Sequence, residues 1–278
     1  MSDTPARPLA GRRIAVLEAR LTDALASLME RAGAEVVRAP ALRERPLEAT
    51  TEVVAFCDAL ETGGFAAVVF LTGVGANALL TEAERLGRLD ATLEALRGAM
   101  TVCRGPKPVA RLARQRVPTK IAVPEPHTTT ELLHVLRGLD LRGQRVGIVH
   151  YGERNDALSD ALLADGVQLI ELCLYEWVLP EDIAPLEHVV RAIIDGEVDA
   201  VAFTSQVQVR HLLHIAERLG ALEALHRQLT THTVVVAVGP TTARMLAASG
   251  ITPTVVPTKP KMGPMVAALG DHFANRRS

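Results

Sequence analysis

The sequence predicts an α/β protein with two parallel β-sheets, built from an internally duplicated unit. Three observations predict this fold class. Short β-branched runs alternate with helical patterns, the strand segments are apolar along almost their whole length, and the two halves of the chain repeat one another. Near-continuous apolar strands are typical of parallel sheets that helices cover on both faces. A chain of 278 residues is also long enough for two domains.

Ten segments are expected to form strands, and helical patterns connect them. The helical pattern is clearest in TDALASLMERAG and in VRHLLHIAERLG, where Leu212, Ile215 and Leu219 recur at helical spacing. Ten strands exceed what one domain of about 130 residues usually holds, so we divide them between two sheets. In chain order, the expected strands are residues 14–19, 35–40, 66–72, 100–105, 120–124, 145–152, 168–177, 199–205, 234–239 and 252–258.

The repeat keeps its order and nearly its offset along the chain. GRRIAVLEARLTDALASLMERAGAEVVRAP is echoed by GQRVGIVHYGERNDALSDALLADGVQLIEL, with 132 positions between Gly11 and Gly143. AAVVFLTGVGANALL is echoed by DAVAFTSQVQVRHLL. VCRGPKPVARLA is echoed by VAVGPTTARMLA, with 134 positions between Gly105 and Gly239. Three blocks in one order indicate a duplicated α/β unit.

Composition excludes several classes of protein. The net charge of -2 argues against a strongly cationic nucleic-acid binder, and no apolar run reaches the roughly 18 residues that a membrane helix needs. The polar start MSDTPARPLAGRR predicts no secretory signal. The three cysteines are far apart and form no CxxC pair, which excludes a disulfide framework and a thiolate zinc site. We therefore expect a cytoplasmic protein.

Ligands of such sheets bind beyond the carboxyl ends of the strands, where loops turn into helix N-termini. Several of these loops are rich in glycine or hydroxyl groups, so backbone N–H groups and the helix dipole can face an anion. If the two units face each other, the predicted site is the cleft between them, which would suit a large polyanion. The loops are residues 18–20, 72–75, 104–108, 151–155, 204–206 and 239–242.

Two motifs have simpler explanations than the sites they resemble. Gly73, Gly75 and Ala78 have GxGxxA spacing, but the next strand ends in Arg104 instead of the acid that a dinucleotide site requires. His211 and a histidine three residues later could share a metal, but no third ligand lies near them in the sequence. A solvated helix face is the better interpretation.

Other motifs leave two interpretations open. Thr241 and Thr242 follow Gly239 and Pro240 at a helix start, where hydroxyls serve either as caps or as part of an anion cradle. The same alternatives apply to Thr204 and Ser205. In a chain with 3% aromatic residues, Tyr175 and Trp177 either pack a connector or, for Tyr175, donate a proton to a leaving group.

Taken together, the duplicated arrangement, FTSQVQVRHLL, VAVGPTTARMLAASGI and LYEW resemble the uroporphyrinogen-III synthase family, over about residues 10–270. The resemblance implies two flavodoxin-like domains, joined by a two-stranded connector, with an interdomain cleft. Domain one would comprise residues 1–40 and 179–278, and domain two residues 45–174. Residues 41–44 and 175–178 would be the connectors.

The resemblance also implies a reaction, that of a cyclising hydro-lyase of tetrapyrrole biosynthesis (heme, siroheme, cobalamin). Hydroxymethylbilane would lose its hydroxyl, ring D would be inverted through a spiro intermediate, and the macrocycle would close as uroporphyrinogen III. No metal or organic cofactor takes part, and neither a nucleic acid nor a membrane is an expected partner. We expect a monomer that contacts hydroxymethylbilane synthase transiently. The substrate carries eight carboxylates, which suits a cleft ringed by helix N-termini.

By the same resemblance, Tyr175 matches the connector tyrosine proposed to assist loss of the hydroxyl. The chain departs from the family pattern at Glu18-Ala19-Arg20 and at Gly105-Pro106-Lys107-Pro108, although Arg20 could still supply a cation. The residues expected to bind substrate are Arg20, Thr72, Gly73, Arg104, Lys107, Tyr151, Thr204, Ser205, Gly239, Thr241 and Thr242.

Two other functions stay open at this point. One is a relative that binds a tetrapyrrole or another anion in a regulatory role without catalysis. The other is a two-domain small-molecule binder similar to periplasmic receptors. The isomer of uroporphyrinogen that forms in the presence of the protein separates the synthase from both.

Overall fold

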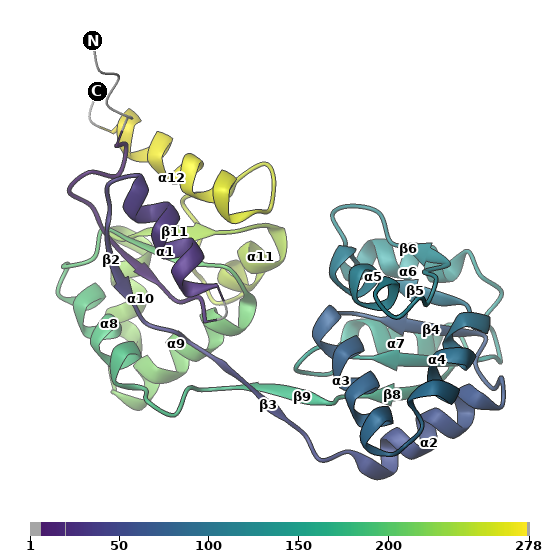
Figure 1. Ribbon diagram of the computed structural model, residues 1–278. Coiled ribbons are helices and arrows are strands. Elements are labelled where there is room, and N and C mark those ends of the chain that lie inside the picture. The colour runs from purple at the N-terminus through teal and green to yellow at the C-terminus, as the bar shows by residue number, and fades with distance from the viewer. Residues whose placement is uncertain (1–6, 20, 277–278) are drawn as a thin grey trace. The chain divides into compact units, whose positions relative to one another are not determined.

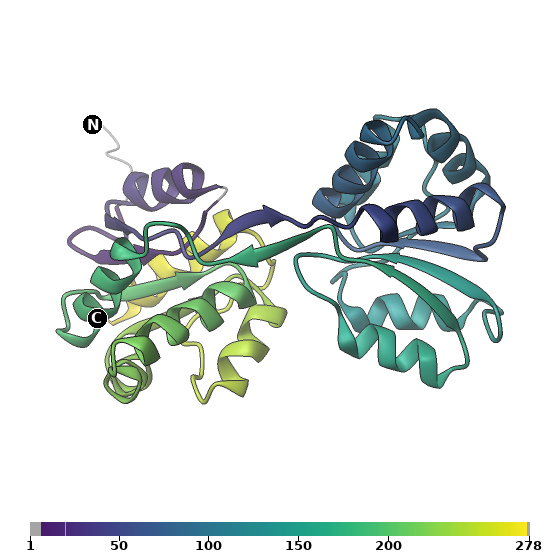
Figure 2. The same cartoon turned by 90° about the horizontal axis from the view of Figure 1, so that it is seen from below.

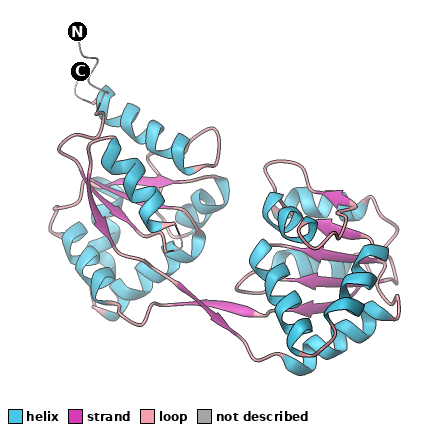
Figure 3. Cartoon of the chain, in the orientation of Figure 1, coloured by secondary structure: helices cyan, strands magenta, loops and turns pink. Residues whose placement is uncertain are grey.

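The computed structural model describes residues 7–19 and 21–276, in which helices and strands alternate (Figure 3). This part of the chain divides into two compact units (Figure 1). The first unit takes the chain up to Arg43 and again from Val178 onward, and the second comprises Glu44–Trp177. Arg20, from which the sequence analysis expected a cation, lies outside the described residues.

The first unit contains a four-stranded sheet in the order β11-β10-β1-β2, with every pair parallel. The register places Ile14 beside Ala200 on one side and Val36 on the other. The strands are β1 (Arg13–Val16), β2 (Glu35–Arg38), β10 (Ala200–Phe203) and β11 (Val234–Ala237). The helices are α1 (Thr22–Arg31), α8 (Ala184–Ile194), α9 (Gln206–Arg218), α10 (Leu222–Thr231), α11 (Pro240–Ala248) and α12 (Met262–Asn275).

Alternate residues of each strand in this sheet face opposite layers, as the period of a strand requires. Ile14 and Val16 belong to the hydrophobic cluster that contains Leu25 of α1 and Leu269 of α12. Ala15 belongs to the other cluster, which residues of α8, α9, α10 and α11 complete. Both faces of the sheet are therefore covered, which explains why its strands are apolar throughout.

The second unit contains a five-stranded parallel sheet in the order β6-β5-β4-β7-β8. Its two faces pack against separate clusters, one with α2, α3 and α4 and the other with α6 and α7 (Figure 2). The strands are β4 (Ala67–Phe70), β5 (Thr101–Cys103), β6 (Ile121–Ala122), β7 (Arg145–Val149) and β8 (Gln168–Leu172). The helices are α2 (Thr50–Glu61), α3 (Gly73–Arg85), α4 (Leu89–Gly98), α5 (Pro106–Ala113), α6 (Thr129–Arg137) and α7 (Asp156–Ala164).

Each unit draws strands from both copies of the repeat. By the repeat offset, β1 and β2 correspond to β7 and β8, while β4 and β5 correspond to β10 and β11. The order β2-β1-β10-β11 of the first sheet therefore matches β8-β7-β4-β5 of the second. The same strand order is built twice, with the contributions of the two halves of the chain exchanged.

Three segments differ from the strands that the sequence predicts. Residues 168–177 form two strands, β8 and β9 (Tyr175–Val178), and residues 252–258 form only an isolated bridge from Val255 to Val236. A strand that the sequence analysis missed, β3 (Arg43–Pro46), pairs with β9 in a two-stranded sheet, and the chain passes between the units through these two strands. β3 and β9 begin 132 positions apart, so they are equivalent in the repeat.

The structure also bears on the membrane prediction. Among the described residues, no helix is both long enough and apolar enough to cross a membrane.

Candidate functional site

In the second unit, the turn from β4 into α3 is closed by Thr72. Thr72 is the N-cap of α3, and its Oγ1 accepts a hydrogen bond of 2.9 Å from the Gly75 N–H group. A side chain at this position satisfies a backbone donor that the helix leaves without an acceptor. The predicted site residue Thr72 is therefore a cap, and its hydroxyl lies at the carboxyl end of the sheet.

The same hydroxyl contacts the tyrosine that the family resemblance singled out. Tyr175 Oη lies 3.1 Å from Thr72 Oγ1, although the two residues are 103 positions apart. The Tyr175 side chain is buried, with 4% of its surface exposed, so its hydroxyl is held in place at the start of β9. This contact links the connector strand to the N-terminus of α3 within one unit.

Arg104, directly after β5, supplies a cation at the same edge of the sheet. Its guanidinium carbon lies 4.9 Å from the centre of the Tyr151 ring, a cation–π contact. Burial lowers the pKa of Arg104, and the nearby phenols of Tyr151 and Tyr175 oppose that shift. Within the described part of the chain, no carboxylate lies within ion-pair distance of this guanidinium.

Both tyrosines of the chain and its single tryptophan form one cluster here. The ring of Trp177 lies 5.4 Å from that of Tyr151 and 6.0 Å from that of Tyr175. Gly152 makes this packing possible, because a Cβ at that position would lie 2.4 Å from Trp177 Cδ2. The indole Nε1 is buried and has no hydrogen-bond partner among the described residues. The sequence analysis assigned Trp177 a packing role only.

The GxGxxA spacing has a packing explanation in this structure. A Cβ at Gly73 would lie 2.9 Å from the carbonyl oxygen of Lys107, and one at Gly75 would lie 2.7 Å from that of His150. Both distances are below what real Cβ contacts show, so each position requires glycine. The glycines let the N-termini of α3 and α5 and the end of β7 approach closely. Lys107 itself is exposed on the first turn of α5.

His127 is a residue of this edge that sequence reasoning missed. It follows β6 with a φ of 59°, in the left-handed region that few non-glycine residues adopt. Its Nδ1 lies 2.8 Å from the Val123 carbonyl oxygen, which can only accept, so Nδ1 carries the proton. The ring packs over Gly105, the N-cap of α5, at 3.6 Å from the position of a Cβ there. The unusual backbone conformation could not be recognised from the sequence.

The corresponding turn of the first unit is also capped, by Ser205. Ser205 and Gln208 form a capping box at the start of α9. Thr204 donates from its hydroxyl to the Glu18 carboxylate, and Gln208 Nε2 donates to Thr204 Oγ1 at 2.8 Å. Thr204 and Ser205 therefore hydrogen-bond to groups of the first unit itself. The charged group beside them is the Glu18 carboxylate, whereas the second unit has the Arg104 guanidinium at this edge.

The start of α11 is arranged differently from the capped turns. Its N-cap is Gly239, which supplies no side chain, so Thr241 and Thr242 are not caps. The first backbone hydrogen bond of the helix joins the Ala243 N–H group to the Gly239 carbonyl at 3.0 Å, so the N–H groups of Thr241 and Thr242 precede it. Such N–H groups can bind an anion. Thr242 is buried and Thr241 is exposed.

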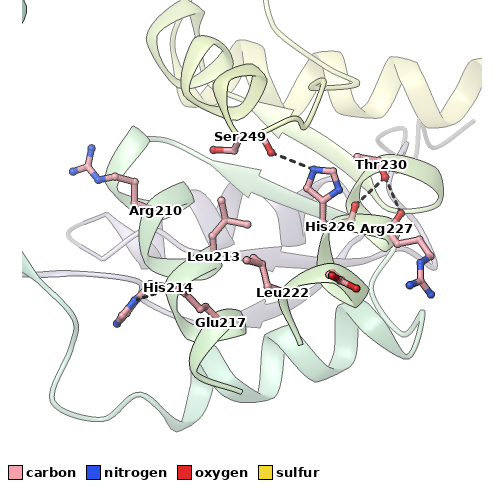
Figure 4. Close-up of a pocket in the computed structure, with 10 residues that line it drawn as sticks. Arg210, Leu213, His214, Glu217, Leu222, His226, Arg227, Thr230 and Ser249 are labelled. Atoms are coloured by element: carbon pink, nitrogen blue, oxygen red, sulfur yellow. Dashed lines mark hydrogen bonds and ion pairs between the residues drawn. The ribbon is translucent and has the colours of Figure 1, made fainter. Parts of the chain in front are cut away.

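A pocket elsewhere in the first unit contains none of the predicted site residues. It has a volume of about 830 Å³ and lies among α9, α10 and the end of α11, with His226 bonded to the Ser249 carbonyl (Figure 4). The two histidines that the sequence analysis considered as a pair make different contacts. His211 Nδ1 donates to the Ala41 carbonyl at 2.7 Å, while His214 lies on the exposed face beside Glu217.

The structure thus gathers five predicted residues of the second unit around one edge of its sheet, namely Thr72, Gly73, Arg104, Tyr151 and Tyr175, with Lys107 on the adjoining helix turn. The predicted residues of the first unit lie at two turns, 204–205 and 239–242, at the carboxyl ends of β10 and β11.

Comparisons with known proteins point to a single family. A family model described as uroporphyrinogen-III synthase HemD matches residues 23–267. The uncharacterized protein YjjA of Bacillus subtilis is 30% identical over 273 residues, which cover 96% of this chain and 98% of YjjA.

Solved structures of the same family resemble the chain along nearly its whole length, among them one from Thermus thermophilus and one from Helicobacter pylori. A crystal structure of a mutant uroporphyrinogen III synthase from the extremely thermophilic bacterium Thermus thermophilus has a TM-score of 0.74 and 25% identity, and the match covers 96% of this chain and all (100%) of that one. Uroporphyrinogen-III synthetase from Helicobacter pylori, 17% identical, has a TM-score of 0.52 with coverages of 96% and 100%, and shows the fold alone.

Proposed function

This chain belongs to the uroporphyrinogen-III synthase family, and we propose that it catalyses the closure of hydroxymethylbilane to uroporphyrinogen III with inversion of ring D. The observation that carries the proposal is the contact of Tyr175 with Thr72 at the capped N-terminus of α3, beside Arg104. A phenol, a hydroxyl and a cation are thereby placed together at the edge of a parallel sheet where ligands of such folds bind.

Substrate binding would rest on donors that lie ahead of the helices. In the second unit, Arg104 and Lys107 supply positive charge for substrate carboxylates. In the first unit, the N–H groups of Thr241 and Thr242 precede the first hydrogen bond of α11 and can bind a carboxylate. A substrate with carboxylates along its whole length offers partners for either set.

Loss of the hydroxyl requires a proton, which Tyr175 would deliver. Thr72 Oγ1 accepts from the Gly75 N–H group, so the Thr72 proton is available to the oxygen of Tyr175. In that orientation the phenolic proton of Tyr175 points away from Thr72 and passes to the departing hydroxyl, which leaves as water. The charge of Arg104 stabilises the phenolate that develops.

After the hydroxyl has left, the inverted closure competes with direct closure, which gives the type I isomer without help. The protein would favour inversion by holding the terminal rings in the geometry of the spiro intermediate. No strong base is needed for this step, because the positive charge of the intermediate is spread over a conjugated ring system.

The resemblance carries further parts of the proposal. The protein would act in the cytoplasm as a monomer, without a cofactor, and would receive its substrate from hydroxymethylbilane synthase by transient contact. Its product would serve heme, siroheme or cobalamin formation.

The isomer of the product tests the proposal. Hydroxymethylbilane is generated in situ by its synthase, this protein is added, and the products are oxidised and separated as uroporphyrin I and III. Predominantly type III product supports the synthase. Type I alone, from a folded protein, rejects it and leaves a relative that binds without catalysis.

A further inference from the structure

Two arginines of the described residues stack on aromatic rings, and they differ in what neutralises their charge. Arg12 lies 4.5 Å from the centre of the Phe273 ring and forms an ion pair of 2.7 Å with Asp199. Arg104 lies 4.9 Å from the centre of the Tyr151 ring, and no carboxylate pairs with it in the part of the chain that the structure describes. The charge of Arg12 is compensated within the protein, whereas that of Arg104 is not.

The fold does not require the Arg104–Tyr151 pair. By the repeat offsets, Ala19 occupies the position of Tyr151 and Val238 that of Arg104 in the first unit. Among its described residues, that unit builds the same strand order without a cation–π contact at this edge. The pair is therefore an addition to the second unit, and it lies among the residues assigned above to substrate.

Stacking and ion pairing have different consequences for a binding site. A carboxylate beside an arginine neutralises it, and a ligand must then displace or compete with that carboxylate. An aromatic ring fixes the guanidinium plane through its quadrupole and leaves the charge in place. A guanidinium that is half-buried, oriented and without an acid partner is ready to bind a carboxylate through two parallel hydrogen bonds.

We propose that Tyr151 is a positioning residue, which acts by holding the Arg104 guanidinium in the orientation that binds one carboxylate of the tetrapyrrole. Trp177 and Gly152 support it, since the indole packs against the Tyr151 ring in space that only glycine leaves at position 152. The choice of a tetrapyrrole as ligand rests on the proposed function. The energetic coupling between Tyr151 and Arg104 does not depend on it.

A double-mutant cycle tests the proposal through binding, without turnover. The dissociation constant of uroporphyrinogen III is measured by anaerobic equilibrium dialysis and read out as uroporphyrin fluorescence after oxidation. Arg104→Gln should raise the dissociation constant about 10- to 100-fold, as expected for a hydrogen bond to a charged group. Tyr151→Leu should raise it about 3- to 10-fold in the native background.

The decisive value is the effect of Tyr151→Leu in the Arg104→Gln background, which should be less than about twofold because the group that it positions is gone. Tyr151→Phe, which keeps the ring, should bind within about threefold of the native protein. Phe273→Leu is the matched control, because it removes the other cation–π contact and should leave the dissociation constant unchanged.

Several results would overturn the proposal. Tyr151→Leu could change the dissociation constant equally in both backgrounds, or Tyr151→Phe could bind as weakly as Tyr151→Leu. The native protein could also fail to bind uroporphyrinogen III. Failure of the proposed function gives a different result. A protein that binds uroporphyrinogen III with the expected coupling but forms no type III isomer retains the inference and loses the synthase.

Discussion

Glu171, on β8, is bonded to His150 after β7 and to Ser159 on α7. Its replacement by glutamine should lower the stability of the second unit. His150 Nδ1 accepts the Asn155 N–H group at 3.1 Å, so Nε2 carries the proton and donates to Glu171 at 2.7 Å. Ser159 also donates to Glu171, and Arg154 Nε lies 3.1 Å from its second oxygen. Glu171→Gln keeps the shape and removes the charge.

The magnitude follows from the pKa of Glu171. Burial alone would raise it, but the hydrogen bonds from His150 and Ser159 outweigh burial and lower the pKa from 4.5 to about 2. Because the folded pKa lies below the unfolded one, the stabilisation is present above pH 4.5 and is lost as the pH falls towards 2. A difference of about 2.5 corresponds to about 3 kcal/mol at neutral pH.

Urea unfolding at pH 7 and at pH 3 measures this contribution. Trp177 is the single tryptophan and belongs to the same unit as Glu171, so its emission follows the unit in question. Glu171→Gln should lower the free energy of unfolding by about 2–3 kcal/mol at pH 7, and by about 1 kcal/mol at pH 3. Glu94→Gln, at an exposed ion pair with Arg97, is the control and should change it by about 0.5 kcal/mol or less. An equal loss at both pH values would refute the reasoning.

Three further pairs of variants, each with its control, test the loops around the strand ends. Gly239→Ala should destabilise the first unit by about 1–3 kcal/mol, because its Cβ would lie 2.7 Å from Pro260 Cβ. The equivalent Gly105→Ala, whose Cβ would lie 3.6 Å from the His127 ring, should be tolerated. Equal melting temperatures of the two variants would contradict this. Gly152→Ala should cost more than about 2 kcal/mol and shift the Trp177 emission, whereas Gly143→Ala, with open space around it, should cost about 1 kcal/mol. His127→Gly relieves a left-handed backbone conformation but removes an imidazole from the site, so its melting temperature should stay within about 3 °C while KM rises about fivefold. Arg116→Gly, at the other non-glycine residue with a positive φ among the described residues, should leave KM unchanged. A rise in both variants would exclude a specific role for His127.

Most of the fold could be predicted because strand burial and the repeat are both visible in the sequence. β3 was missed because RERP has no β-branched or aromatic residue that would indicate a strand, although the repeat offset from β9 points to it. Residues 252–258 were expected to form a full strand because of Val255 and Val256. Pro253 and Pro257 flank them, and a residue without an N–H group cannot extend a ladder, so only a bridge forms.

The site was predictable as a set of loops, but its geometry was not. The carboxyl ends of parallel strands meet at one edge, which is why Thr72, Arg104 and Tyr151 could be grouped from the sequence. That Tyr175 bonds to Thr72 depends on the path of β9 after β8, which no spacing reveals. His127 could not be found, because a loop histidine between a proline and a threonine carries no signal of a left-handed conformation.

The central claim is that Tyr175, supported by Thr72 and Arg104, promotes loss of the hydroxyl from hydroxymethylbilane. The direct measurement is the rate of uroporphyrinogen III formation by Tyr175→Phe beside the native protein, with circular dichroism to establish that both are folded. We predict that kcat falls by about 100-fold or more, the range of general-acid effects, while KM changes little. A folded Tyr175→Phe protein that forms the type III isomer at the native rate would contradict the account.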